Sequence, residues 1–216
     1  MKINIENILI DKNKVLKFLG YANRKVPNII MKKVDEEIEK SYSLINPVAF
    51  IKSFKIDNIK EDTVYFGDSY SFKSEYLSKE LKTSSSLYLA IYTIGNEIEE
   101  KINEHSNNSE MIRGMILDKI GVVALDNIRN KLKELILKEV EPFKISAQVF
   151  PEMKDFHISN QKIILEAFND ENNIITISKH YQLSPIRTVA VVFGIGNTED
   201  DKSMCDRCEN KCFLNN

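Results

Sequence analysis

The three cysteines of the chain stand together near its C-terminal end. They form the pattern Cys205-x-x-Cys208-x-x-x-Cys212. Thiolates at such short spacing can converge on one ion, and in a chain expected to be cytosolic metal binding is favoured over a disulfide. Three sulfur ligands leave one position of Zn²⁺ open, or they hold an iron–sulfur cluster with one site filled from elsewhere. We therefore predict a zinc or iron–sulfur site at these cysteines, with a tail of free reactive thiols as the alternative.

The other side chains that could do acid–base or nucleophilic chemistry are scattered. His105 lies at a charged helix end and is expected to be solvated, whereas His157 and His180 lie in two segments expected to face each other. A lone histidine without an identified partner is more often structural than functional. No Ser–His–Asp set, phosphate-cradling glycine loop or paired carboxylate motif is present. We therefore expect no catalytic side chain of hydrolase or kinase type.

Length and charge bound the class of protein. With 216 residues the chain is long enough for one well-buried domain. The net charge of -2 gives no general reason to expect nucleic acid or an anionic membrane as a partner. No apolar run approaches the roughly 20 residues that span a bilayer. Because the N-terminus carries acidic and amide residues where a signal peptide needs an apolar segment, we expect a cytoplasmic protein.

Two apolar sequence patterns predict the elements that form the core of the protein. In the stretch 188–195 Val189, Val191 and Phe193 point one way along an extended chain, and apolar residues also point the other way. A strand that is apolar on both faces is expected in the middle of a sheet, and we expect it to form a core hairpin with residues 174–178. Residues 109–140 form the longest helical pattern, and its 120–132 part should pack against this strand.

The remaining patterns complete the expected architecture. We expect one α+β domain with a twisted, mainly antiparallel sheet flanked by helices on one side. Strands are expected within 1–10, 48–56, 62–66 and 87–95, helices at 11–20, 27–42, 74–81 and 96–105, and loops at 84–86 and 145–161.

Four segments together carry a resemblance to a known family. They are VLKFLGY at 15–21, LAIYTIG at 89–95, LDKIG at 117–121 and the strand–loop–strand at 171–196. In this order they resemble the activation (reactivation) domain of vitamin B12-dependent methionine synthase. They are more similar still to its short free-standing forms from anaerobic bacteria, which also end in a cysteine cluster. The resemblance implies that residues 1–200 form the activation-domain-like part and residues 201–216 a cysteine-containing tail.

The resemblance also implies a site for S-adenosylmethionine in the 148–157 loop, facing residues 178–189. In the family an Arg-x-x-Pro-Gly-Tyr loop holds this ligand, and here only Pro151 matches. Gln148 stands in the Arg place and lacks the charged bidentate grip on a carboxylate. Glu152 stands in the Gly place, where it hinders close backbone approach and repels that carboxylate, and Met153 stands in the Tyr place. The implied ligand-binding residues are Gln148, Phe150, Pro151, Asp155, Tyr181, Pro185 and Thr188.

The resemblance implies an accessory role in cobalamin-dependent methionine synthase activity. This activity is a methyltransferase reaction of methionine biosynthesis. The chain would present S-adenosylmethionine to a separate cobalamin-binding methionine synthase module or other corrinoid protein, and dock on it. A reductant such as flavodoxin would supply the electron for reductive remethylation of cobalamin. Two alternatives remain open. One is a docking protein that has lost S-adenosylmethionine binding, and the other is a small metal or iron–sulfur redox protein that uses the C-terminal cysteines.

Overall fold

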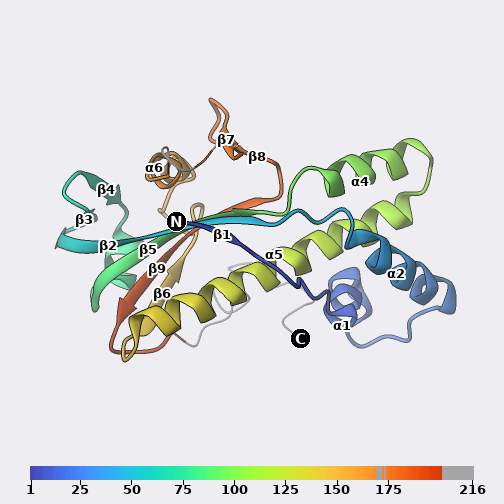
Figure 1. Cartoon of the computed structure of the whole chain (residues 1–216), viewed down its shortest axis with the longest axis horizontal. Coiled ribbons are helices and arrows are strands. Elements are labelled where there is room, and N and C mark those ends of the chain that lie inside the picture. Colours follow the sequence, from blue (N-terminus) through green and yellow to red (C-terminus); the bar gives the residue numbers. More distant parts are fainter. Residues whose placement is uncertain (169–171, 173, 201–216) are drawn as a thin grey trace.

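The structure is a computed structural model that describes residues 1–168, 172 and 174–200 (Figure 1). Its strands are β1 (Lys2–Asn4), β2 (Val48–Lys60), β3 (Thr63–Phe66), β4 (Tyr70–Lys73), β5 (Ser84–Thr93), β6 (Lys144–Val149), β7 (Thr176–Ile177), β8 (Leu183–Ser184) and β9 (Thr188–Gly196). Its helices are α1 (Lys12–Leu16), the π-helical turn η1 (Lys17–Tyr21), α2 (Asn28–Ser41), α3 (Glu75–Glu80), α4 (Glu97–Asn107), α5 (Met111–Val140) and α6 (Asn160–Glu166).

One large antiparallel sheet organises the fold. Its strands follow the order β4-β3-β2-β5-β9-β6, and β1 pairs with β2. Every pairing between these strands is antiparallel. The expected α+β class with a mainly antiparallel sheet is therefore confirmed.

Helices cover both faces of this sheet, which corrects the expectation of helices on one side. On one face α5 packs against Val191 and Phe193 of β9, whose side chains are fully buried. Val189 is half-buried against the same cluster, so the predicted contact between the central strand and the long helix is confirmed. On the other face residues of α3 and α6 pack against Ala190 and Val192. The two-sided apolar pattern of β9 follows from this double cover.

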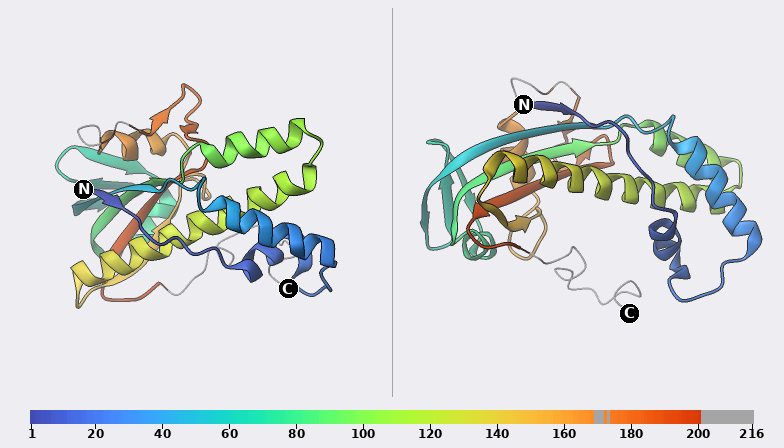
Figure 2. Two further views of the ribbon diagram at one scale, coloured as in Figure 1. Left: turned by 45° about the vertical axis from the view of Figure 1, so that its right-hand side comes forward. Right: turned by 60° about the horizontal axis from the view of Figure 1, so that its bottom comes forward.

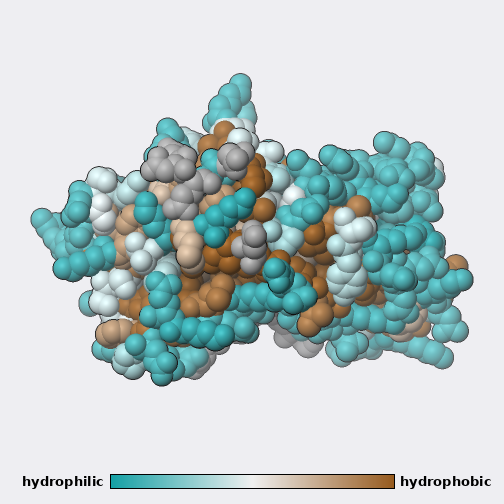
Figure 3. Space-filling model, in the orientation of Figure 1, coloured by the Kyte–Doolittle hydropathy of each residue, from teal (hydrophilic) through white to brown (hydrophobic). Residues whose placement is uncertain are grey.

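The first half of α5 extends beyond the sheet, where α2 and α4 lie beside it (Figures 1 and 2). Hydrophilic residues dominate the surface of this helical arm, whereas apolar residues gather over the sheet (Figure 3). His105 is not solvated as predicted but 4% exposed, because α2 and α5 enclose it together with Glu37. Across the described ranges no helix combines the length and apolar character needed to cross a membrane.

Three local expectations were wrong. Residues 84–86 continue β5 instead of forming a loop, because β9 pairs with them and the Ser84 and Ser146 hydroxyls lie 2.8 Å apart. The segment 145–161 is not all loop, because its first residues form β6 and fill the free side of β9. Residues 174–178 do not pair with β9, which pairs with β5 along its length and with β6 over residues 192–196. Instead Thr176 and Ile177 pair with β8 in a separate two-stranded hairpin.

Candidate functional site

The candidate site lies where β6 stops covering β9. The two strands pair from Lys144 opposite Gly196 to Val149 opposite Val192. Phe150 and then Pro151 follow, and because proline has no backbone N–H the ladder cannot continue past it. Among the described residues, 188–191 of β9 therefore pair with β5 on one side and with no strand on the other. We call this second side the open flank of β9.

Backbone polar groups of two residues point toward the open flank. The carbonyl oxygen of Arg187 accepts from the N–H of Ile94 at 3.4 Å, so Arg187 points toward β5. Successive residues of an antiparallel strand direct their backbone groups to opposite sides. The N–H and C=O groups of Thr188 and Ala190 therefore point the other way, the side on which Val192 pairs with β6.

These groups have no protein partner on that side within the part of the chain that the structure describes. Ala190 is only 3% exposed. Buried backbone donors and acceptors are almost always paired, with protein, water or a ligand. The open flank thus has two donors and two acceptors without a partner among the described residues.

The 150–157 loop borders the open flank and is held in a tight conformation. The N–H of Glu152 donates to the carbonyl of Phe156 at 2.7 Å, and the N–H of Met153 donates to that of Phe150 at 3.1 Å. Pro151 and Phe156 are buried. Glu152 has φ 79°, the left-handed region that favours glycine. Residue 152, which the resemblance matches to a glycine, therefore has the backbone conformation that glycine favours.

The 178–188 segment faces this loop. The rings of His157 and Tyr181 meet edge to face, with centroids 6.4 Å apart. Tyr181 has φ 63°, and Pro185 is buried. The Thr188 hydroxyl donates to the carbonyl of Pro185 at 2.6 Å, which ties the start of β9 to the segment before it. The predicted meeting of the two segments is therefore present.

Asp155 anchors the loop to α3. Its carboxylate accepts from Ser74 Oγ at 2.9 Å and from the backbone N–H groups of Glu75 at 2.6 Å and Tyr76 at 3.1 Å. Burial alone raises the pKa of the Asp155 carboxyl, but these hydrogen bonds outweigh it and hold the pKa below its usual value. The predicted ligand-binding role of Asp155 stays a prediction. Its visible role is to fix the loop on the helix.

Gln148 sits in β6 and not in the loop. It pairs with Phe193 and is 4% exposed. Because Ala147 and Val149 point to the α3 and α6 face, Gln148 points to the α5 face. The structure thus brings six of the seven predicted residues to the loop or the opposite segment: Phe150, Pro151, Asp155, Tyr181, Pro185 and Thr188. Gln148 lies within the sheet beside them.

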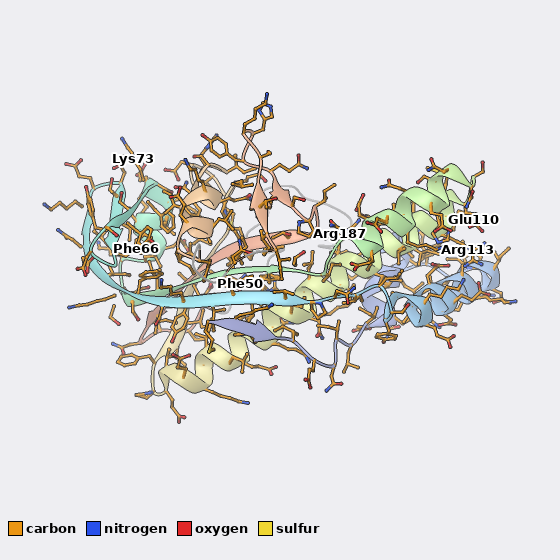
Figure 4. The ribbon with its side chains drawn as sticks, turned by 45° about the horizontal axis from the view of Figure 1, so that its top comes forward. Phe50, Phe66, Lys73, Glu110, Arg113 and Arg187 are labelled. Atoms are coloured by element: carbon orange, nitrogen blue, oxygen red, sulfur yellow. The ribbon has the colours of Figure 1, made fainter. Side chains whose placement is uncertain are left out.

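An arginine that the sequence reasoning missed fixes the start of β9. Arg187 Nη2 donates to Asp118 at 2.8 Å and lies 3.2 Å from a Glu99 carboxylate oxygen. A Cβ on Gly121 would stand 3.0 Å from Arg187 Nη1, so this glycine makes room for the guanidinium. Arg187 lies where α4 and α5 meet (Figure 4). The signal in the sequence was the spacing of Asp118 and Gly121, which share one helix face.

The metal prediction falls on residues outside the described ones. Cys205, Cys208 and Cys212 all lie in the stretch 201–216. Among the described residues no group of three or more His, Cys, Asp or Glu side chains could hold a metal ion. The zinc or iron–sulfur site therefore stays a prediction.

Comparisons with known proteins support the fold. No protein-family model matches the sequence, and no curated protein matches it by sequence. By structure the chain is similar to the crystal structure of the MetH reactivation domain bound to AdoHcy, with a TM-score of 0.67 and 9% sequence identity. The match covers 94% of this chain and 80% of that one. The two proteins share a fold, and it is the fold that the sequence resemblance implied.

Proposed function

We propose that this chain binds S-adenosylmethionine on the open flank of β9, between the 150–157 loop and the 178–188 segment. The observation that carries the proposal is the set of backbone groups of Thr188 and Ala190 that point to this flank. An adenine edge places an N–H donor beside a nitrogen acceptor, which matches a strand edge that offers both N–H and C=O. The similar MetH reactivation domain was solved with AdoHcy, the demethylated form of the same ligand.

The surroundings of the flank suit the rest of such a ligand. Phe150 and Tyr181 come from the two bordering segments, and an aromatic face attracts a sulfonium cation. Loop residues held by Asp155 and by internal hydrogen bonds give a preorganised wall. The chain would then position the methyl group and leave the bond-making to a nucleophile on a partner.

The role that follows is that of a reactivation-like protein. Its partner would be a separate cobalamin-dependent methionine synthase module or another corrinoid protein, with a reductant such as flavodoxin. The partner's corrinoid would supply the nucleophile that accepts the methyl group. A docking protein without ligand binding is the alternative, and it is an outcome of the test below.

Isothermal titration calorimetry tests the proposal. S-adenosylmethionine and S-adenosylhomocysteine are titrated into the native chain and into Glu152→Gly, which gives residue 152 the glycine that the resemblance matches to it. Removing one exposed like charge at about 4 Å from the ligand carboxylate changes the binding free energy by about 1 kcal/mol, so Glu152→Gly should bind S-adenosylmethionine roughly fivefold more tightly. S-inosylhomocysteine, which lacks the adenine amino donor, should bind more weakly than S-adenosylhomocysteine. If neither protein binds at millimolar ligand, the methyl-donor role fails and the docking-only reading stands.

A further inference from the structure

Two of the three charged side chains of the 150–157 loop, those of Lys154 and Asp155, contact α3. Lys154 lies over the ring of Tyr76 on α3, with Nζ 5.5 Å from the ring centroid. Asp155 binds the first residues of α3. Both therefore face α3. Glu152 is exposed, and its carboxylate has no hydrogen bond or ion pair with any described residue. Its negative charge is therefore not neutralised within the described structure.

The two permanent cations of the 178–188 segment, Lys179 and Arg187, form no ion pair with Glu152 in the described structure. Arg187 is 12% exposed and already pairs with Asp118 and Glu99 on the helical arm. Lys179 lies in the turn between β7 and β8, which projects away from the body of the molecule (Figure 1). The site is therefore bordered by aromatic rings and one free carboxylate, a combination that suits a cation and disfavours a carboxylate.

We propose that this site selects adenosyl compounds whose tail ends in an amine and carries no α-carboxylate. The inference rests on the proposed function and deepens it by naming the ligand class. S-adenosylmethionine brings a sulfonium, an ammonium and a carboxylate, whereas its decarboxylated form brings the two cations alone. Glu152 attracts both cations and repels the carboxylate, so it is the specificity-determining residue.

The size of the preference follows from the exposure of Glu152. One contact between exposed charges at about 4 Å in water changes affinity by roughly fivefold. The native chain should therefore bind S-adenosyl-3-methylthiopropylamine, the decarboxylated compound, about fivefold more tightly than S-adenosylmethionine. Added salt should reduce this ratio, because screening weakens contacts between exposed charges.

Competition calorimetry with the two compounds at low and high salt measures the ratio. Glu152→Gln keeps the shape of the side chain and should bring the ratio close to one. Glu152→Gly, which suits the left-handed backbone at this position, is the second variant and should act in the same direction. Asp68→Asn is the matched control: Asp68 is also acidic, exposed and left-handed, with φ 64°, but it lies between β3 and β4. It should leave the ratio unchanged.

The outcomes separate this inference from the function on which it rests. If S-adenosylmethionine binds as tightly as the decarboxylated compound, the inference is overturned while the proposed function stands. A preference that survives in both Glu152 variants also overturns it, because Glu152 would not be its source. Absence of binding by every adenosyl compound overturns the proposed function and the inference together.

Discussion

Glu152 holds a backbone conformation that most side chains avoid. Its φ of 79° lies in the left-handed region, which costs a non-glycine residue roughly 1–2 kcal/mol, partly offset by the greater freedom that glycine has in the unfolded chain. We expect Glu152→Gly to raise the free energy of unfolding by about 1 kcal/mol, measured by urea denaturation. Glu152→Ala keeps the Cβ and should give no such gain. A clear loss of stability in the glycine variant would contradict this account.

Asp155 should make stability depend on pH in the acid range. Its folded pKa lies below the usual value of 3.8, so its contribution is present above that value and is lost as the pH falls through the folded pKa. Asp155→Asn keeps the shape but removes the charge at the start of α3, an effect of about 0.5–1 kcal/mol at pH 7. The difference in unfolding free energy between native and variant chains should shrink toward zero below about pH 3. An equal difference at pH 7 and pH 3 would show that charge plays no part.

Some residue contacts could be predicted and others could not. The meeting of the 150–157 loop with the 178–188 segment was predicted, because the resemblance ordered both around one strand. The pairing of Arg187 with Asp118 was not, because it depends on where β9 begins relative to α4 and α5. The left-handed backbone at Glu152 was hidden as well, since a glutamate gives no sign of the conformation that a glycine would mark.

At the scale of elements, a buried charge network joins α2, α4 and α5. Glu37 is 1% exposed, and its carboxylate lies 2.5 Å from Arg113 Nη1 and 3.4 Å from His105 Nε2. Arg113 also pairs with Glu36 at 2.6 Å. Figure 4 shows Arg113 and Glu110 close together on the helical arm. The network adds ion pairs to the apolar contacts that Val34, Ile98 and Ile116 make in the same three helices.

Removing Arg113 should destabilise the arm strongly. Arg113→Met leaves the buried Glu37 carboxylate without its main partner, which costs about 3–5 kcal/mol. The double variant Arg113→Met/Glu37→Leu removes both charges and should recover most of the loss. Arg129→Met is the control, because its partner Asp126 is more exposed and can be hydrated. Urea denaturation of the four proteins checks the order, and equal losses in both arginine variants would contradict the role of burial.

Elements with clear periodicity were predicted, and those that depend on a neighbour were not. The 3.6-residue pattern of α5 and the two-sided apolar pattern of β9 marked both elements. The serines at 84–86 carry no strand pattern of their own and are extended because β9 pairs with them. For the same reason β6 could not be separated from the loop that follows it. Pairing across the sheet is a tertiary effect that local sequence does not encode.

At the scale of the whole molecule, the cysteine tail is the part that the fold does not explain. The N–H of Asp200, the last described residue, donates to the carbonyl of Ile145 in β6 at 2.8 Å. We predict that Cys205, Cys208 and Cys212 bind zinc or an iron–sulfur cluster, which elemental and sulfide analysis of anaerobically purified protein should detect. Replacing the three cysteines by serine should remove the metal and leave the rest of the fold intact. Anaerobic protein without zinc, iron and sulfide would contradict the prediction.

The overall architecture was the most predictable level. An apolar strand in the middle of a sheet needs cover on both faces, and a long helix with a wide apolar face supplies it on one of them. That α3 and α6 would supply the other face was not evident, because both helices are short and their apolar residues few. The similarity to the MetH reactivation domain over 94% of the chain shows that this fold is shared with a known structure.

The most direct test of the central claim is to follow backbone amide resonances by NMR while S-adenosylmethionine is added to the isotope-labelled native chain. The open flank of β9 predicts the largest shifts at Thr188 and Ala190, whose N–H groups point toward the ligand, with further shifts in the 150–157 loop. Val189 and Val191 bind β5 through their backbone and should shift less. Shifts confined to the helical arm, or none at millimolar ligand, would contradict the account.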